Sequence, residues 1–103
     1  MQIKSKIVNK TLYILMAGEL DEYTVPKVRE DLDRLMETEH GFMQIVLDLS
    51  ELTFMDSLGV GVLIGRYKKM RQLNKPIFIT NPSRVAEKIF KMSGLYDIMP
   101  KIV

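Results

Sequence analysis

The chain has no cysteine and no tryptophan among its 103 residues, and its single histidine is His40. Without cysteine there is no disulfide framework, no thiolate metal site and no thiol nucleophile. A serine–histidine triad needs a base beside the serine, and one histidine at a predicted helix end does not supply it. The glycine–lysine loop that holds nucleotide phosphates in many enzymes is also missing. The sequence therefore favours a protein that is not an enzyme and has no cofactor.

Long apolar runs and an excess of one charge are missing as well. No segment is long enough to span a bilayer, and residues 1–10 lack the continuous apolar core of a signal peptide. Lys plus Arg number 15 and Asp plus Glu 13, so the formal net charge is +2. This balance favours neither nucleic acid nor an anionic membrane as a partner. The acidic residues show no spacing typical of a metal site. We expect a cytoplasmic protein without a bound metal.

The pattern of apolar residues predicts an alternation of strands and helices. The expected strands cover residues 2–8, 11–17, 43–49 and 76–80, with a short last strand within 96–103, and a turn at 9–10 joins the first two. One expected helix is capped by Thr24, and a second runs from Ser57 to about residue 74. A third runs from Asn81–Pro82 to Gly94, with Val85, Ile89 and Met92 facing inward. Right-handed crossovers would place a mixed sheet against the helices. We therefore expect one α/β domain over residues 1–103.

The most informative segment is FMDSLGVGVLIGRYK, residues 54–68. An apolar stretch ends there, an acidic and a hydroxyl residue follow at Asp56–Ser57, and a glycine-spaced helix begins. A serine at this position can cap the helix through its side-chain oxygen. The positive end of the helix dipole at the same place suits an added phosphate.

The predicted helix after Ser57 has two contrasting faces. The face expected to point to the core carries Val60, Leu63, Ile64, Tyr67 and Met70. The other face carries Leu58, Gly61, Val62, Gly65, Arg66 and Lys69. Each interior glycine costs a helix about 1 kcal/mol relative to alanine, so the pair needs a reason. The two glycines either let a neighbouring helix or the sheet approach closely, or form a flat docking face for another protein.

Three sequence blocks resemble the STAS-domain anti-sigma-factor antagonists of bacteria, closest to the sporulation antagonist and its general-stress relatives. The first block is Gly18-Glu19-Leu20-Asp21, closing on Thr24; the second runs from Ile45 to Leu49 and on to Phe54-Met55-Asp56-Ser57; the third is Met92-Ser93-Gly94-Leu95. The blocks occur in the family order and span nearly the whole chain, and the middle one is the most specific. Leu58 departs from the second serine that many relatives carry, and many relatives continue into a final helix beyond the position of Val103.

The resemblance implies a STAS-like fold with helices mainly on one side of the sheet. It also implies a mechanism in which the unphosphorylated protein binds an anti-sigma factor and frees the sigma factor. In that family the anti-sigma factor is an ATP-binding serine kinase that phosphorylates the serine matching Ser57. Phosphorylation breaks the binding, and a serine phosphatase restores it.

The partner-binding residues implied around Ser57 are Asp21, Asp56, Leu58, Gly59, Gly61, Val62, Gly65 and Arg66. Asp21 has a second interpretation, as a turn residue whose carboxylate bonds nearby backbone amides. Two other functions stay open. One is a STAS phospho-switch or scaffold module of another stress-signalling pathway, and the more distant one is an NTP-binding protein.

Overall fold

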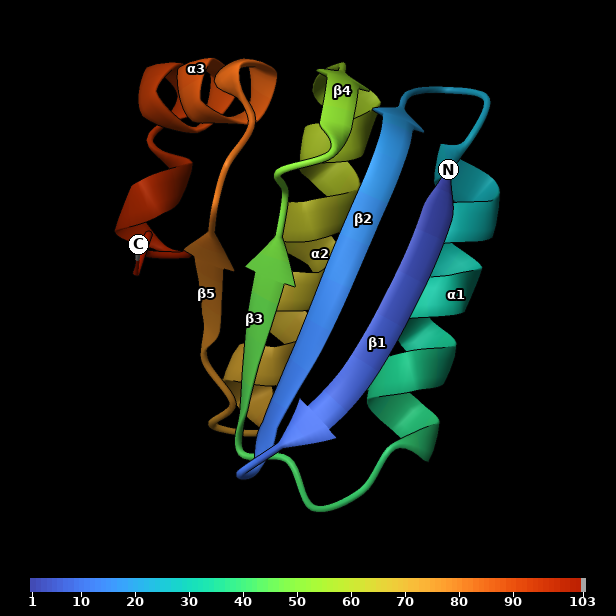
Figure 1. Cartoon of the computed structure of the whole chain (residues 1–103), viewed down its shortest axis with the longest axis vertical. Coiled ribbons are helices and arrows are strands. Elements are labelled where there is room, and N and C mark those ends of the chain that lie inside the picture. Colours follow the sequence, from blue (N-terminus) through green and yellow to red (C-terminus); the bar gives the residue numbers. More distant parts are fainter. Residues whose placement is uncertain (103) are drawn as a thin grey trace.

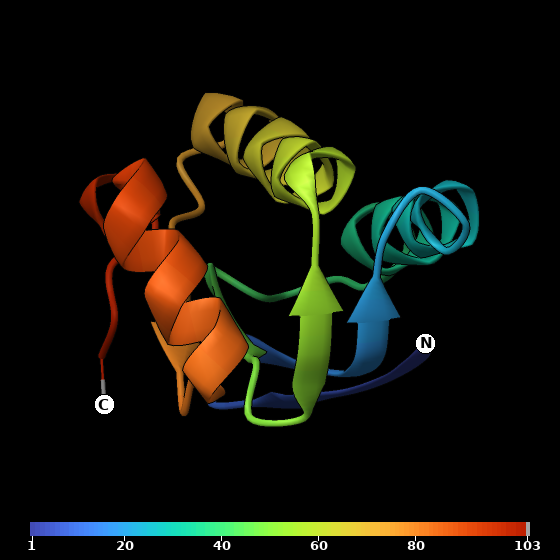
Figure 2. The same ribbon diagram turned by 90° about the horizontal axis from the view of Figure 1, so that it is seen from above.

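The computed structural model describes residues 1–102 and forms a five-stranded sheet with three α-helices. The elements are β1 (Gln2–Val8), β2 (Thr11–Leu20), α1 (Val25–Thr38), β3 (Gln44–Asp48), β4 (Leu52–Met55), α2 (Ser57–Gln72), β5 (Ile77–Thr80), α3 (Arg84–Ser93) and a 3₁₀ turn, η1 (Leu95–Asp97). The strand order is β1-β2-β3-β5, and β4 pairs with the far end of β2. α1 and α2 lie on one side of this sheet (Figures 1 and 2).

The hairpin between β1 and β2 turns at the predicted residues. Asn9 and Lys10 both have positive φ, 49° and 64°, as a two-residue type I′ turn requires. β2 is longer than predicted and extends to Leu20. Its last residues pair in parallel with β4, a strand that sequence analysis did not identify. β4 has only four residues, two of them exposed, and only residues 49–51 separate it from β3.

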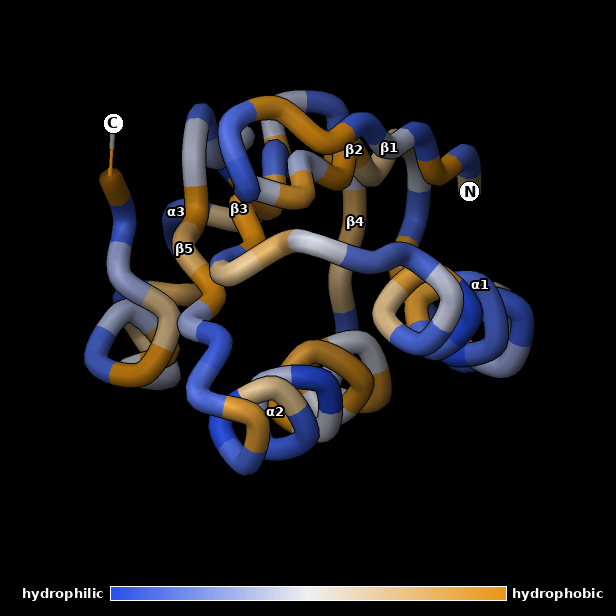
Figure 3. The backbone as a smooth tube through the Cα atoms, turned by 90° about the horizontal axis from the view of Figure 1, so that it is seen from below, coloured by the Kyte–Doolittle hydropathy of each residue, from blue (hydrophilic) through white to orange (hydrophobic). Residues whose placement is uncertain are grey.

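The core lies between the sheet and the helices, and α3 contributes Ala86 and Phe90 to it. On α1 the buried residues are Val25, Val28, Leu32 and Met36, which recur at helical spacing. Figure 3 shows hydrophilic residues gathered along the outer side of this helix, whereas polar and apolar residues alternate around α2. β3 supplies Ile45, Val46 and Leu47, which are all buried. The opposite face of the sheet carries no helix (Figure 2).

The C-terminal third differs from the sequence prediction in three places. Ser83 rather than Asn81 caps α3, and its Oγ accepts a hydrogen bond from the Ala86 N–H at 3.2 Å. Asn81 has a φ of 46° and belongs to the preceding turn. The prediction that Met92 faces inward is wrong, because its side chain is 77% exposed, and Phe90 occupies the core instead. Ala86 and Phe90 are the buried residues of α3, whereas the predicted Val85 and Ile89 are half-buried, so the inward face lies one position from the predicted one.

The predicted last strand is also wrong for the described residues. Residues 95–97 form η1, and only Lys101 bridges to β5, opposite Ile79. Val103 lies outside the described residues. A polar cluster holds this segment to α3. The Glu87 carboxylate accepts hydrogen bonds from the Tyr96 hydroxyl at 2.7 Å and from Lys101 Nζ at 2.8 Å.

This cluster makes the stability of the C-terminal segment depend on pH. The hydrogen bond from Lys101, and then that from Tyr96, hold the pKa of Glu87 below its ordinary value of 4.5. A depressed folded-state pKa stabilises the fold at pH values above the unfolded-state pKa, and this stabilisation is lost as pH falls through the folded-state value. We expect the free energy of unfolding to fall below pH 4.5. Urea titrations of the wild type and of Glu87→Gln at pH 7 and pH 3 test this. An equal pH dependence in both proteins would contradict it.

Candidate functional site

Ser57 is the first residue of α2 and is exposed to solvent. The helix cap is Asp56, not Ser57. Asp56 has an extended backbone, and its Oδ1 accepts a hydrogen bond from the Gly59 N–H at 3.0 Å. The interpretation of Ser57 as the cap is therefore corrected: a carboxylate one residue earlier takes that role. The hydroxyl of Ser57 is left free of a capping function at the helix start.

Asp56 also ties the start of α2 to the loop before α1. Its Oδ2 accepts a hydrogen bond from the Glu22 N–H at 3.1 Å, and its own N–H donates to the Leu20 carbonyl at 3.2 Å. Segments more than thirty positions apart in the sequence therefore meet beside Ser57. Glu22 and Asp56 make the surroundings of Ser57 acidic.

The loop itself is built by Asp21 and Thr24. Asp21 Oδ1 accepts hydrogen bonds from the N–H groups of Tyr23 at 2.9 Å and Thr24 at 3.0 Å, which is the turn role considered for it. Thr24 precedes α1 but makes no side-chain cap, contrary to the prediction. Its hydroxyl instead donates to the Glu19 carbonyl at 2.8 Å and accepts from the Asp21 N–H at 3.0 Å.

The structure divides the predicted docking residues of α2 into two groups. Leu58 and Gly61 are exposed and Gly65 is half-buried, so these three form a surface next to Ser57. Val62 and Arg66 are only 4% and 7% exposed and face the interior, as does Gly59. The predicted core stripe is correspondingly displaced. Of its members Leu63 and Met70 are buried, while Val60, Ile64 and Tyr67 are half-buried.

The three glycines of α2 have different surroundings. A Cβ on Gly59 would stand 2.6 Å from the Leu20 carbonyl oxygen and 2.8 Å from Leu20 Cγ, so this glycine allows α2 to start against the end of β2. A Cβ on Gly61 or Gly65 would meet nothing within 4 Å. Close internal packing therefore explains Gly59 and does not explain Gly61 or Gly65.

Arg66 is a buried cation between α1 and α2. Its Nε lies 3.2 Å from Asp33 Oδ1, an ion pair that lacks hydrogen-bond geometry, and neither Nε nor Nη1 has a hydrogen-bond partner among the described residues. Lys69 Nζ reaches the same Asp33 oxygen at 3.1 Å. Two cations of α2 thus share one carboxylate of α1, and these ion pairs join the two helices.

Two exposed apolar residues near the site were not identified from the sequence. Tyr23 is 84% exposed in the loop that Asp56 holds, and Phe54 is 47% exposed on β4. A large aromatic residue within a polar turn was the available signal for Tyr23. Phe54 lies on a strand that sequence analysis missed, so its outward direction could not be predicted.

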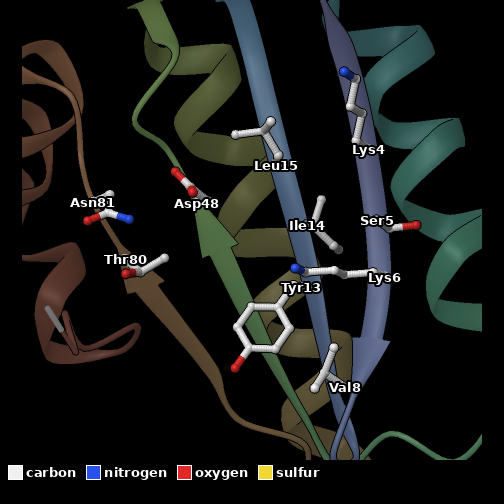
Figure 4. A pocket seen from close by; sticks show the side chains of 10 residues that line it. All are labelled: Lys4, Ser5, Lys6, Val8, Tyr13, Ile14, Leu15, Asp48, Thr80 and Asn81. Atoms are coloured by element: carbon white, nitrogen blue, oxygen red, sulfur yellow. The ribbon is translucent and has the colours of Figure 1, made fainter.

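Other kinds of site receive no support from the part of the chain that the structure describes. No group of three or more metal-ligating side chains is present in residues 1–102. No helix of these residues is long and apolar enough to cross a membrane. A shallow hollow does occur on the helix-free face of the sheet, lined by residues of β1 and β2 and by Asp48, Thr80 and Asn81 (Figure 4). Ser57 does not line it.

An exposed serine begins a capped helix directly after a short strand, and both the sequence and the fold around it resemble those of known proteins. The sequence matches the family model of the STAS domain over residues 2–103. The chain belongs to the STAS domain family. One relative of this STAS protein is the anti-sigma-B factor antagonist of Listeria monocytogenes, 37% identical over 86 residues that cover 84% of the chain and 74% of the relative. Another is the anti-sigma F factor antagonist of Paenibacillus polymyxa, 36% identical, with 97% and 85% covered.

The fold of this STAS domain also matches solved structures. The anti-sigma factor antagonist SpoIIAA in its unphosphorylated form superimposes with a TM-score of 0.78 at 28% identity, over 99% of this chain and 89% of that one. The phosphorylated form of the Bacillus protein gives a TM-score of 0.72 at the same identity, with 99% and 92% covered. The expected family and the expected α/β fold are confirmed.

Proposed function

We propose that this STAS protein is an anti-sigma-factor antagonist whose unphosphorylated form binds an anti-sigma factor and thereby frees a sigma factor. The names of the two curated relatives support this, and so does the likeness to SpoIIAA. The observation that carries the proposal is the exposed Ser57 at the start of α2, with Asp56 taking the capping role beside it.

In this proposal Ser57 is the phosphate acceptor of an ATP-dependent anti-sigma factor kinase, and a serine phosphatase reverses the modification. The first N–H groups of an α-helix have no intrahelical acceptor, so those of Ser57 and Leu58 are available to a phosphate. Asp56 already occupies the Gly59 N–H. The modified serine therefore has local donors and needs no rearrangement of the sheet.

Phosphate would act at the interface. It adds a charge of about −1.5 to −2 near neutral pH, beside Asp56 and the Glu22 segment, which are already acidic. A partner surface shaped for a neutral hydroxyl must then desolvate both the charge and the bulk. We expect nearly the same backbone in both forms and faster dissociation of the partner from the phosphorylated one. Amide spectra of both forms test this, and unwinding of α2 would contradict it.

The proposed docking surface keeps all the residues implied by the family resemblance but gives them two roles. Leu58, Gly61 and Gly65 contact the partner, together with the newly identified Tyr23. The remaining residues act from beneath or beside that surface by fixing the backbone: Asp21, Asp56, Gly59, Val62 and Arg66.

The first test concerns Ser57. Incubation of the wild type with the cognate kinase and ATP should add one phosphate, mapped to Ser57, and lower kinase affinity at least tenfold. Ser57→Ala should bind as tightly as the unmodified protein and resist inactivation. Because Asp56 is the cap, Ser57→Ala should also unfold within about 0.5 kcal/mol of the wild type. Phosphate on Ser50, Thr53 or Ser93 would contradict the assignment.

The second test concerns the docking surface. Gly61→Leu places a bulky side chain into open space, so we expect loss of partner binding with an unchanged circular dichroism spectrum. Gly61→Ala is the matched control and should keep most of the binding. Calorimetric titration with the anti-sigma factor measures both. Full affinity of Gly61→Leu would remove this face from the interface.

Identifying the protein that co-purifies with Ser57→Ala separates the proposal from its alternative. If the partner that co-purifies with Ser57→Ala is a large multi-subunit scaffold and not an ATP-binding kinase, the chain is a switch module of another stress pathway. We further propose that the protein is not an enzyme, acts in the cytoplasm, has no cofactor, and uses neither nucleic acid nor membrane as a partner. The near-balanced charge of the chain supports the last point.

A further inference from the structure

The two outer edges of the sheet differ in whether another segment covers them. The β5 edge is covered by the C-terminal segment: the Ile79 N–H donates to the Pro100 carbonyl and the Ile79 carbonyl accepts from the Ile102 N–H, both at 2.8 Å. β1 forms the opposite edge and pairs with β2 along all seven of its residues. No backbone hydrogen bond joins its outer side to another described segment.

The free side of β1 is a template for another strand. In an antiparallel pair, every second residue directs its N–H and C=O groups away from the neighbouring strand. An unpaired edge of this kind can accept an extended segment through main-chain hydrogen bonds, while alternate side chains of that segment meet different surroundings. The side chains on the two faces of β1 therefore decide which segment fits.

The two faces of β1 differ in charge. On the side of α1, Ile3 and Ser5 line a groove with Asp31, Arg34 and Leu35. Arg34 Nη1 lies 3.6 Å from Asp31 Oδ1, so the charges of this groove are already paired. On the helix-free side Lys4 and Lys6 border the hollow, with Lys6 lying across β2 toward Tyr13 (Figure 4). Neither lysine forms an ion pair within residues 1–102, and the Lys6 Nζ is 5.9 Å from the centre of the Tyr13 ring.

We propose that the β1 edge binds an extended segment of a partner protein in which apolar and acidic residues alternate. The apolar side chains would pack toward Ile3 and Leu35 of the groove, and the acidic ones would pair with Lys4 and with Lys6, whose exposed side chain would turn from Tyr13 toward the edge. This surface goes beyond the proposed switch, because none of its residues belongs to the surface around Ser57.

A second copy of the chain fits this edge poorly. Antiparallel pairing of β1 with itself centred on Ser5 places Lys4 opposite Lys6, and like charges that face each other across a strand pair are destabilising. Edge lysines also prevent sheets from aggregating, and that protective role is the competing explanation for Lys4 and Lys6. Binding of an acidic strand separates the two explanations.

The test uses two capped ten-residue peptides, one alternating valine with glutamate and the other valine with lysine. With isotope-labelled wild type, the glutamate peptide should shift the amide signals of β1 and slow hydrogen exchange there at least tenfold. The lysine peptide should do neither. Lys4→Glu combined with Lys6→Glu should reverse this preference.

The matched control changes the same number of lysines elsewhere. Lys88 and Lys91 are exposed on α3, which lies toward the opposite edge of the sheet from β1 (Figure 1). Lys88→Glu combined with Lys91→Glu should leave the preference for the glutamate peptide unchanged. No binding of the glutamate peptide, equal binding of both peptides, or signals that shift at α2 instead of β1 would overturn the proposal and leave the lysines with only a protective role.

Discussion

Asp33→Ala is expected to lower the free energy of unfolding by about 3 kcal/mol, because it leaves Arg66 as a buried cation without a counter-charge. The Arg66 side chain is 9% exposed and that of Asp33 is 23% exposed. Partial exposure of the carboxylate places the expected loss at the lower end of the range for broken buried pairs. For a domain of this size the loss corresponds to a melting temperature about 15 °C lower.

Arg66→Met is the informative counterpart. Two Arg66 nitrogens have no hydrogen-bond partner among the described residues, so burying this side chain is already costly. Removing one partner of a buried ion pair is costly when it leaves the other charge buried and unpaired. Asp33 would keep its ion pair with Lys69 at 3.1 Å. We expect Arg66→Met to unfold within about 1 kcal/mol of the wild type in urea titrations.

The pair of variants also tests the role of Arg66 in docking. If Arg66 acts from beneath the surface, Arg66→Met should bind the anti-sigma factor nearly as well as the wild type. A stable Arg66→Met protein that has lost binding would show that the guanidinium contacts the partner directly. A loss of stability equal to that of Asp33→Ala would contradict the account of the buried charge.

Gly59→Ala is expected to destabilise the protein by about 2 to 3 kcal/mol, although alanine is the better helix former. The added Cβ would stand 2.6 Å from a backbone oxygen of Leu20, which cannot move without displacing the end of β2. The Asp56 N–H donates to the same Leu20 carbonyl, so the displacement should also disturb the position of the neighbouring Ser57. The melting temperature and the affinity for the partner should therefore both fall.

Gly61→Ala and Gly65→Ala are the matched controls on the same helix. Each adds a Cβ into open space, so only the helix propensity changes and each should stabilise by about 0.5 to 1 kcal/mol. Opposite signs for Gly59 and for the other two glycines are the expected result in urea titrations. Destabilisation by Gly61→Ala would mean that the helix is more closely covered at Gly61 than this structure shows.

Much of the fold could be predicted because its signals are local. The turn at Asn9–Lys10 needs positive φ at both residues, and the sequence places a tolerant Asn first. Gly94 ends α3 in the left-handed conformation with a φ of 72°, as expected for a helix-terminating glycine. β3 is a continuous apolar run, which is typical of a buried parallel strand.

The errors come from choices between neighbouring candidates that local pattern does not resolve. Asp56 and Ser57 are both good caps, as are Asn81 and Ser83, and tertiary contacts select one of each pair. For Asp56 the deciding contact is the Glu22 N–H, thirty-four positions away. The apolar residues of α2 lie around much of the helix, so periodicity did not define its inward face.

The family, the α/β class and the position of Ser57 at the start of a helix could be predicted from the sequence, because they depend on motifs and on the order of local elements. Which residues of that helix are available to a partner depends on long-range contacts that appear only in the folded protein. α2 lies with Gly59 against Leu20, and in this orientation Val62 and Arg66 are buried and Arg66 pairs with Asp33 of α1. Leu58 and Gly61 remain at the surface, and the hydrogen bond from the Glu22 N–H to Asp56 holds the loop that carries Tyr23 beside the helix start, a contact that no local pattern encodes.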